Sequence, residues 1–122
     1  RNLFPEEVEA RLMAHPDISQ VAVLGLPDPQ RGQVVHAVLM RPSDDSSHAP
    51  SMTGSTEVEA PALVSMTPAP AHLVAWCHQT LESYKVPRHW WRWQGRWPMT
   101  ASGKTDLAAL RQALEGATRA RP

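Results

Sequence analysis

The spacing of apolar residues near the start of the chain predicts an amphipathic helix. Pro5 suits its first position, where a missing N–H costs nothing, and glutamates fill the first turns. Val8 and Leu12, together with Phe4, form the apolar side that we expect to face a core. The helix should end before Pro16, because a residue that precedes proline avoids the α-helical region.

Two continuous apolar runs follow and predict a β-hairpin. Residues 21–26 and 34–40 are rich in valine and leucine, as in strands buried on both faces. The residues between them include prolines, Asp28 and Gly32, which favour a turn. A short turn between two such runs predicts antiparallel pairing.

The segment 43–70 breaks this pattern and predicts a flexible insertion within the domain. It contains six serines, three threonines, four prolines and four acidic residues, but no lysine or arginine. Such a composition buries too little apolar surface to offset the entropy lost on ordering. Residues 53–56 (Thr-Gly-Ser-Thr) look like a phosphate loop, but they lack a preceding strand and a following lysine, so we interpret them as linker.

The remaining residues predict a helix, an aromatic strand and a final helix. The helical period returns over residues 71–81, and residues 89–93 alternate as a strand with Trp91 and Trp93 buried and Trp90 more exposed. The final helix should start at a capping aspartate and bury three leucines: Asp106, Leu107, Leu110 and Leu114. Together the elements predict an α+β fold, with a small, mainly antiparallel three-stranded sheet packed with about three helices.

Composition limits the classes of site that we expect. The 122 residues suffice for one domain, and the net charge of zero indicates no particular partner. The single cysteine, Cys77, excludes an internal disulfide, lies on an apolar helix stripe and fits a cytoplasmic location. The six histidines show no metal-ligand spacing, and no apolar run is long enough to cross a membrane. We therefore expect no metal site and no membrane span.

Tryptophans and arginines interleave over residues 88–97 and allow two interpretations. Aromatic rings between cations could stack the bases of a single-stranded nucleic acid. Strand alternation instead predicts that tryptophans fill the core while arginines cover the outer face. We favour packing and expect no nucleic-acid partner, because no nucleic-acid motif accompanies the pattern.

The strongest candidate site is the loop 97–104 (Trp-Pro-Met-Thr-Ala-Ser-Gly-Lys), which presents Lys104. Thr100, Ser102 and Gly103 should support it, since small residues let the backbone approach a ligand closely. Lysine provides a compact charge on a long stem, which suits an anionic substrate.

Several motifs resemble, in their order, a known family. They are residues 1–9 (Arg-Asn-Leu-Phe-Pro-Glu-Glu-Val-Glu), 15–16 (His-Pro), 21–28, 32–35, Leu81, Tyr84, Lys85, Pro87, Pro98, Thr100, 102–104 and 110–111. The chain thereby resembles the C-terminal domain of AMP-forming acyl-activating enzymes, most closely that of acyl-CoA synthetases. The resemblance covers nearly everything except 43–70. Departures include Gln33, where glutamate is common, and Trp97, where leucine is usual.

The resemblance implies a reaction in two steps. In this family a carboxylate attacks the α-phosphate of ATP, and the acyl group of the resulting adenylate then passes to the thiol of CoA or of a carrier protein's pantetheine. The C-terminal domain rotates between the steps. Lys104 would be the catalytic residue of the first step. Gly25, Asp28 and Gly32 of the hairpin would face the thiol acceptor in the second.

The resemblance also implies partners that the chain does not contain. A large N-terminal domain, holding ATP with Mg and the carboxylic acid, would precede Arg1, so we expect residues 1–122 to be a lid domain that is inactive alone. Its acceptor would be CoA or an acyl carrier protein. The alternative is a free-standing, degenerate lid that binds a protein or single-stranded nucleic acid, with the tryptophan–arginine segment exposed.

Overall fold

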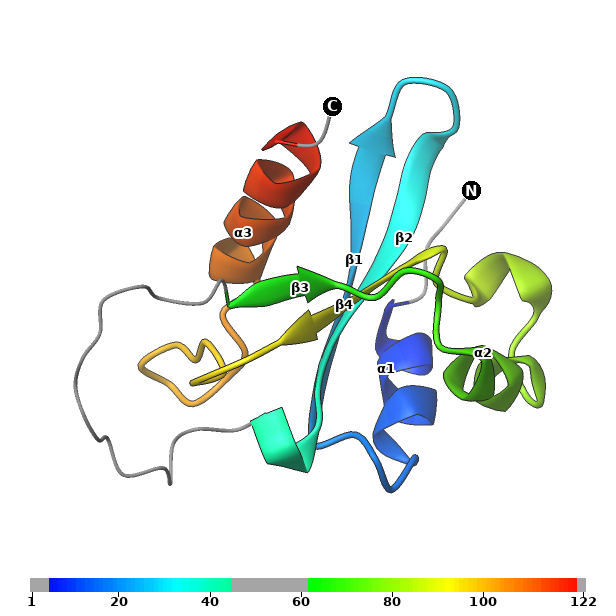
Figure 1. Cartoon of the computed structure of the whole chain (residues 1–122), viewed down its shortest axis with the longest axis horizontal. Coiled ribbons are helices and arrows are strands. Elements are labelled where there is room, and N and C mark those ends of the chain that lie inside the picture. Colours follow the sequence, from blue (N-terminus) through cyan, green and yellow to red (C-terminus); the bar gives the residue numbers. More distant parts are fainter. Residues whose placement is uncertain (1–4, 45–61, 121–122) are drawn as a thin grey trace.

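The computed structural model describes residues 5–44 and 62–120, which form a sheet with helices on both faces (Figure 1). The predicted α+β class is confirmed, and the described residues contain three α-helices. None of these helices is long and apolar enough to cross a membrane. The elements in chain order are α1 (Pro5–Met13), β1 (Gln20–Asp28), β2 (Gly32–Met40), the 3-10 helix η1 (Pro42–Asp44), β3 (Leu63–Ser65), α2 (Ala71–His78), the 3-10 helix η2 (Ser83–Lys85), β4 (His89–Trp93) and α3 (Leu107–Ala120).

The strands lie in the order β1-β2-β4-β3. β1 and β2 pair antiparallel along their whole length, so the predicted hairpin is confirmed. β4 runs parallel to β2, and β3 runs antiparallel to β4. The sheet is therefore mainly antiparallel, as predicted, but within the described residues it has four strands rather than three.

The additional strand, β3, corrects the limits of the insertion predicted over residues 43–70. Leu63 pairs with Trp93, and Ser65 pairs with Trp91, so this part belongs to the sheet. A strand of three residues is too short to show a period within a serine- and proline-rich sequence. Residues 45–61, with the phosphate-loop-like run 53–56, lie outside the described residues.

Two apolar cores form, one on each face of the sheet. α1 and α2 cover one face, where Leu12 and Cys77 are fully buried, and Cys77 is the core residue that its sequence position predicted. α3 covers the other face through Leu110 and Leu114. Leu107, expected in this core, is instead 49% exposed, because the buried stripe of α3 begins one turn later.

The tryptophans of β4 divide between the two cores. Trp90 is 2% exposed and Trp91 is 5% exposed, while Trp93 is half-buried. The prediction that Trp90 is more exposed than Trp91 and Trp93 is therefore wrong. β4 lies between two other strands and has helices over both faces, so strand alternation points Trp90 into one core and Trp91 and Trp93 into the other.

Candidate functional site

The segment between β4 and α3 forms a closed turn that presents Lys104. Met99 and Thr105 form an isolated antiparallel bridge at its base. The Thr100 N–H donates to the carbonyl oxygen of Lys104 at 2.7 Å, and the Gly103 N–H donates to the carbonyl of Thr100 at 3.0 Å. These bonds fix the backbone on both sides of the lysine while its side chain stays exposed.

The three residues expected to support this loop lie together. Thr100 Oγ1 accepts the Lys104 N–H at 3.2 Å and lies 3.1 Å from Ser102 Oγ. Gly103 has a φ of +88°, a conformation that favours glycine, and a Cβ atom there would meet nothing within 4 Å. Glycine is therefore needed for the shape of the turn rather than for space.

The base of the loop is anchored by a residue whose role the sequence analysis missed. Trp97 is 5% exposed, and its Nε1 donates to Thr105 Oγ1 at 3.0 Å. Asp106 accepts the Ala109 N–H at 3.1 Å, so it caps α3 as predicted. The sequence gives one signal for this anchor: Trp97 stands where leucine is usual, eight residues before Thr105.

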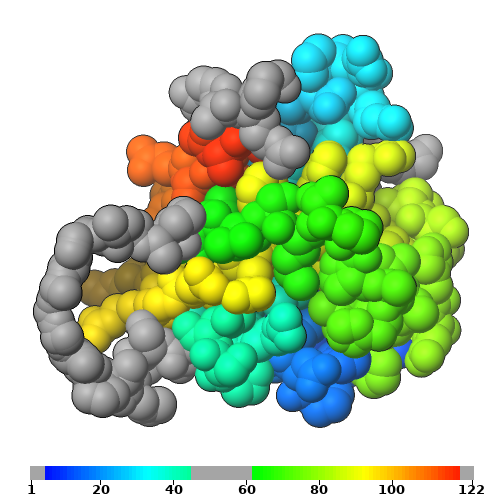
Figure 2. Space-filling view, in the orientation of Figure 1, coloured from blue at the N-terminus to red at the C-terminus, as the bar shows by residue number. Residues whose placement is uncertain are grey.

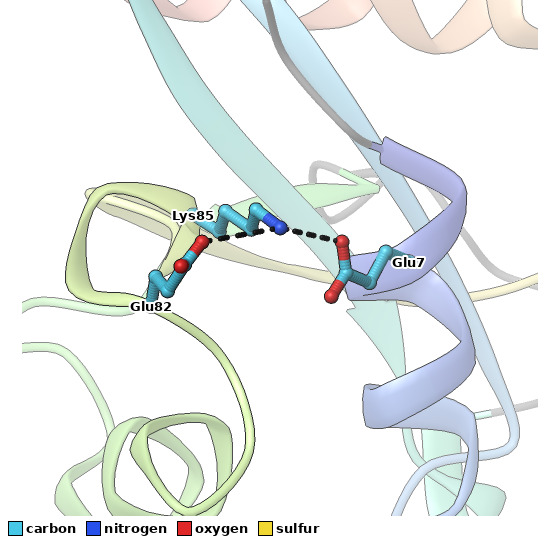
Figure 3. A network of polar contacts seen from close by, with 3 residues as sticks. All are labelled: Glu7, Glu82 and Lys85. Atoms are coloured by element: carbon cyan, nitrogen blue, oxygen red, sulfur yellow. Dashed lines mark hydrogen bonds and ion pairs between the residues drawn. The ribbon is translucent and has the colours of Figure 1, made fainter.

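The two lysines of the chain, Lys85 and Lys104, differ in their ion-pair partners. The Lys85 ammonium lies 2.8 Å from Glu7 Oε1 and 3.3 Å from Glu82 Oε1, between α1 and η2 (Figure 3). The bond with Glu7 raises the pKa of Lys85. Within the described residues, no carboxylate comes within ion-pairing distance of Lys104. Lys85 is thus engaged within the fold, whereas Lys104 can face an external anion.

Of the hairpin residues expected at the thiol-acceptor face, Asp28 and Gly32 shape the β1–β2 turn, and Gly25 lies within β1. Asp28 Oδ1 accepts the N–H groups of Gln30 at 2.8 Å and Arg31 at 3.0 Å, and these bonds lower the pKa of its carboxyl group. Gly32 has a φ of +85°, which the turn requires. The carbonyl of Gly25 accepts a bond from Arg111 Nη1 at 3.2 Å, which links β1 to α3.

Two adjoining clefts flank the hairpin and the start of β4. One of about 610 Å³ is lined by Asp28, His36, His89 and Thr118 among others. The other, of about 530 Å³, includes two arginines, Arg31 and Arg88, and shares Arg88 with the first. These cations could hold a phosphate-bearing ligand.

His36, in the first cleft, is a buried histidine that the sequence analysis did not single out. It is 5% exposed, and its Nδ1 accepts the Trp91 Nε1–H at 3.0 Å. Its ring stacks on His89 with centroids 4.7 Å apart. Burial, followed by the nearby His89, lowers the pKa of His36 to about 4.

The Lys104 loop and the hairpin tip lie at different ends of the molecule. In Figure 1 the loop extends to the left beyond β4, whereas the tip stands at the top. The structure therefore brings Thr100, Ser102 and Gly103 to Lys104 but keeps the hairpin residues away from it.

The tryptophan–arginine segment does not provide an open row of aromatic rings for bases. Trp90, Trp91 and Trp97 are buried. Trp93 is half-buried, and its Nε1 donates to the carbonyl of Arg96 at 2.9 Å. The packing interpretation is thus confirmed, and the nucleic-acid interpretation has no support in these contacts.

Residues 7–104 match the protein family described as the AMP-binding enzyme C-terminal domain. The chain is 32% identical over 114 residues to an uncharacterised acyl-CoA ligase, YhfT, of Bacillus subtilis, covering 93% of this chain and 18% of that protein. It is 31% identical over 115 residues to 2-succinylbenzoate–CoA ligase of Bacillus velezensis, covering 94% of this chain and 19% of that protein.

Solved structures show the same fold. o-Succinylbenzoate CoA synthetase from Bacillus subtilis, bound with a product analogue, matches with a TM-score of 0.63 and 27% identity over 92% of this chain and 18% of that chain. A fatty acyl CoA synthetase of Mycobacterium tuberculosis matches with a TM-score of 0.68 and 24% identity over 96% of this chain and 19% of that chain. The chain spans less than a fifth of the length of the two Bacillus ligases named above.

Proposed function

The chain belongs to the AMP-binding enzyme C-terminal domain family, and we propose that it is the mobile C-terminal domain of an AMP-forming acid–thiol ligase, similar to acyl-CoA synthetases. In this proposal Lys104 assists formation of the acyl-adenylate, and the domain then rotates for transfer of the acyl group to a thiol. The observation that carries the proposal is the exposed Lys104 on a hydrogen-bonded loop, at the last residue of the family match. Among the described residues no carboxylate lies within ion-pairing distance of it.

The chemistry of adenylate formation suits such a lysine. A carboxylate oxygen attacks the α-phosphorus of ATP, and pyrophosphate leaves. Two anions must approach, and negative charge builds up on the phosphoryl oxygens, so a positioned ammonium group lowers the barrier. The bonds from Thr100 and Gly103 hold the backbone of the loop in place before the reaction, while the long lysine stem reaches toward the substrates.

Acyl transfer would use the opposite end of the domain. The thiol attacks the acyl carbon, AMP leaves, and a thioester forms. Asp28 and Gly32 fix the hairpin turn, and the adjoining clefts offer Arg31 and Arg88 to the phosphates of CoA or of a carrier protein's pantetheine. Two functional ends on one domain are consistent with a rotation that presents them in turn.

The remaining binding groups would lie outside this chain. We propose that an N-terminal domain of the same enzyme binds ATP with Mg and the carboxylic acid, and that this domain closes over them. The chain covers only 18% and 19% of two relatives that it matches, which leaves room for such a domain.

The proposal is tested in the full-length enzyme by replacing Lys104 with alanine. Adenylate formation, followed by pyrophosphate release, should slow by about 10²–10³, the usual loss for one preorganised stabilising group. Thioester formation from synthetic acyl-adenylate should be nearly unchanged, because the rotated domain carries Lys104 away. Lys104→Arg should rescue poorly, since a planar guanidinium does not replace a compact ammonium.

Arg96→Ala is the matched control, because it removes an exposed positive charge close to the same loop. Both half-reactions should keep their rates in this variant. Equal losses in both half-reactions of Lys104→Ala would mean that Lys104 is structural, and the assigned role would be wrong.

A further inference from the structure

Three side chains that can bind metal ions meet where the end of α1 faces the start of α2. His15 and Asp17 lie in the connection from α1 to β1, and His72 is the second residue of α2. One potential ligand atom of each lies within 4.8 Å of the others. The blue segment after α1 and the green segment of α2 adjoin at the lower edge of the molecule in Figure 2.

We propose that His15, Asp17 and His72 form a binding site for one zinc-like divalent metal ion, which ties the α1–β1 connection to α2. Two imidazoles and one carboxylate suit zinc, nickel or copper, whereas magnesium and calcium prefer oxygen ligands alone. Three protein ligands and one water complete a tetrahedral zinc site. Neither the proposed catalytic lysine nor the hairpin takes part.

The distances need only a small adjustment. Asp17 Oδ2 lies 4.0 Å from His72 Nε2. Tetrahedral zinc with bonds of about 2.0–2.2 Å separates its ligand atoms by roughly 3.4 Å. The side chains of His72 and Asp17 are 62% and 63% exposed, so rotation about their side-chain bonds can close the remaining gap without moving the backbone.

The backbone under the site is held in place by a separate set of contacts. Arg11 Nε donates to the carbonyl of Trp76 at 2.9 Å, and Trp76 Nε1 donates to the carbonyl of Arg11 at 2.8 Å. The Arg11 guanidinium lies 3.9 Å from the centre of the Trp76 ring. The His15 ring meets the same tryptophan edge-on at 4.8 Å. The two elements are therefore juxtaposed before any metal binds, which lowers the entropy lost on binding.

Metal binding would displace one weak hydrogen bond. His15 Nδ1 accepts the N–H of Asp17 at 3.1 Å, an exposed interaction. A metal ion bound to Nδ1 takes the place of this hydrogen bond. If the metal ion binds Nε2 instead, the neutral ring carries its proton on Nδ1, and Nδ1 can then no longer accept the Asp17 N–H. In both cases water can take over the amide, so the net loss is small.

The sequence analysis expected no metal site, because no pair of histidines has ligand spacing along one element. His72 is 57 positions away from His15, and the packing of α1 against α2 brings them together. The order of residues alone gives no signal for such a site.

Isothermal titration of ZnCl₂ into metal-free chain tests the proposal. We expect one zinc ion per chain, with no comparable binding of MgCl₂. His72→Ala and Asp17→Asn, both at exposed positions, should each weaken binding at least about tenfold. His78→Ala is the matched control, since His78 is exposed on the same helix but outside the cluster, and it should bind as the original chain does.

A thermal scan provides an independent readout. A ligand that binds only the folded state raises the melting temperature, so zinc should raise it in the original chain and in His78→Ala but not in His72→Ala. Melting scans without zinc show that each variant is folded. The proposal is overturned if no saturable zinc binding occurs, or if binding persists unchanged in His72→Ala. Persistent binding would place the ion elsewhere, for example at the stacked His36 and His89.

Discussion

At the scale of single residues, Lys85 and Lys104 differ in whether carboxylates surround them. Glu7 and Glu82 hold Lys85, and the pKa of Glu82 is lowered by its bond with the Tyr84 hydroxyl and by Lys85. The side chains of Glu7 and Glu82 are 47% and 66% exposed, so we assign the network an orienting role between α1 and η2 rather than a large share of stability. Lys104 has no such partner among the described residues, so its side chain can contact an anionic ligand.

His36 should make the stability of the fold depend on pH. Its pKa is about 4 in the folded chain, against about 6.5 when exposed in the unfolded chain. Between these values the unfolded state binds more protons, so stability falls as pH decreases from 6.5 towards 4. At pH 5 the loss from this group is about 2 kcal/mol relative to pH 7.5. Denaturant unfolding at the two pH values measures it.

His36→Gln should remove most of that pH dependence, because its amide oxygen can still accept the Trp91 Nε1–H. His78→Gln, at an exposed position, should retain it. An unchanged pH dependence in His36→Gln would show that other groups cause the loss.

At the scale of elements, β4 has to be treated as an interior strand with a core on each side. Trp90 packs with α1 and α2, and Trp91 packs with α3. Trp90→Ala and Trp91→Ala should therefore each lower the free energy of unfolding by about 3–5 kcal/mol, as expected for large aromatic residues in a core. Trp93→Ala should lower it less, because Trp93 is only half-buried. Denaturant unfolding of the three variants gives the order, and a smaller loss for Trp90 than for Trp93 would contradict the two-core arrangement.

The elements that the sequence predicted well are those whose period extends over several residues. The helix at Pro5, the hairpin and the capping residue Asp106 were all predicted, because each leaves a local signal. β3 and the burial of Trp90 were not, because both depend on which strands become neighbours. The site divides in the same way: the loop around Lys104 carries a local motif, whereas the anchor at Trp97 and the cluster with His72 arise from tertiary packing.

The two described residues that flank the segment 45–61, Asp44 and Ala62, both bond to the residues that follow β4. The carbonyl of Asp44 accepts the Gly95 N–H at 3.0 Å, and the carbonyl of Ala62 accepts the Gln94 N–H at 2.8 Å. The Asp44 carboxylate also lies 3.2 Å from Arg92 Nε. Asp44 and Ala62 therefore bond to two consecutive residues, Gly95 and Gln94, and a chain much shorter than 17 residues can connect them.

Replacing residues 45–61 with four glycine or serine residues should leave stability unchanged or raise it by about 1 kcal/mol. Shortening a loop roughly fourfold recovers about 0.6 kcal/mol of closure entropy for each halving. Denaturant unfolding tests this expectation. A control deletion that extends through residue 65 also removes β3 and should destabilise the domain clearly. A loss of several kcal/mol in the shorter deletion would mean that residues 45–61 pack against the fold.

At the scale of the whole molecule, residues of this chain form both apolar cores. Helices α1 and α2 on one face and α3 on the other bury their apolar sides against one sheet, so we expect the chain to fold without a second domain. The two functional ends proposed here, by contrast, are open. The turn at Lys104 offers one charge, and the hairpin clefts offer arginines, but neither encloses a nucleotide together with an acid.

The purified 122-residue chain should accordingly fold cooperatively and catalyse no ATP–pyrophosphate exchange with any carboxylic acid. One exposed ammonium group cannot supply the proximity and water exclusion that the first half-reaction requires. Thermal unfolding followed by circular dichroism tests the first expectation, and radiolabelled pyrophosphate exchange tests the second. The Lys104→Ala chain serves as the control, because exchange that is equal in both preparations comes from a contaminating ligase. Exchange that appears in the original chain and disappears with Lys104 would show that this domain holds a complete adenylation site, and the division of labour with an N-terminal domain would have to be abandoned.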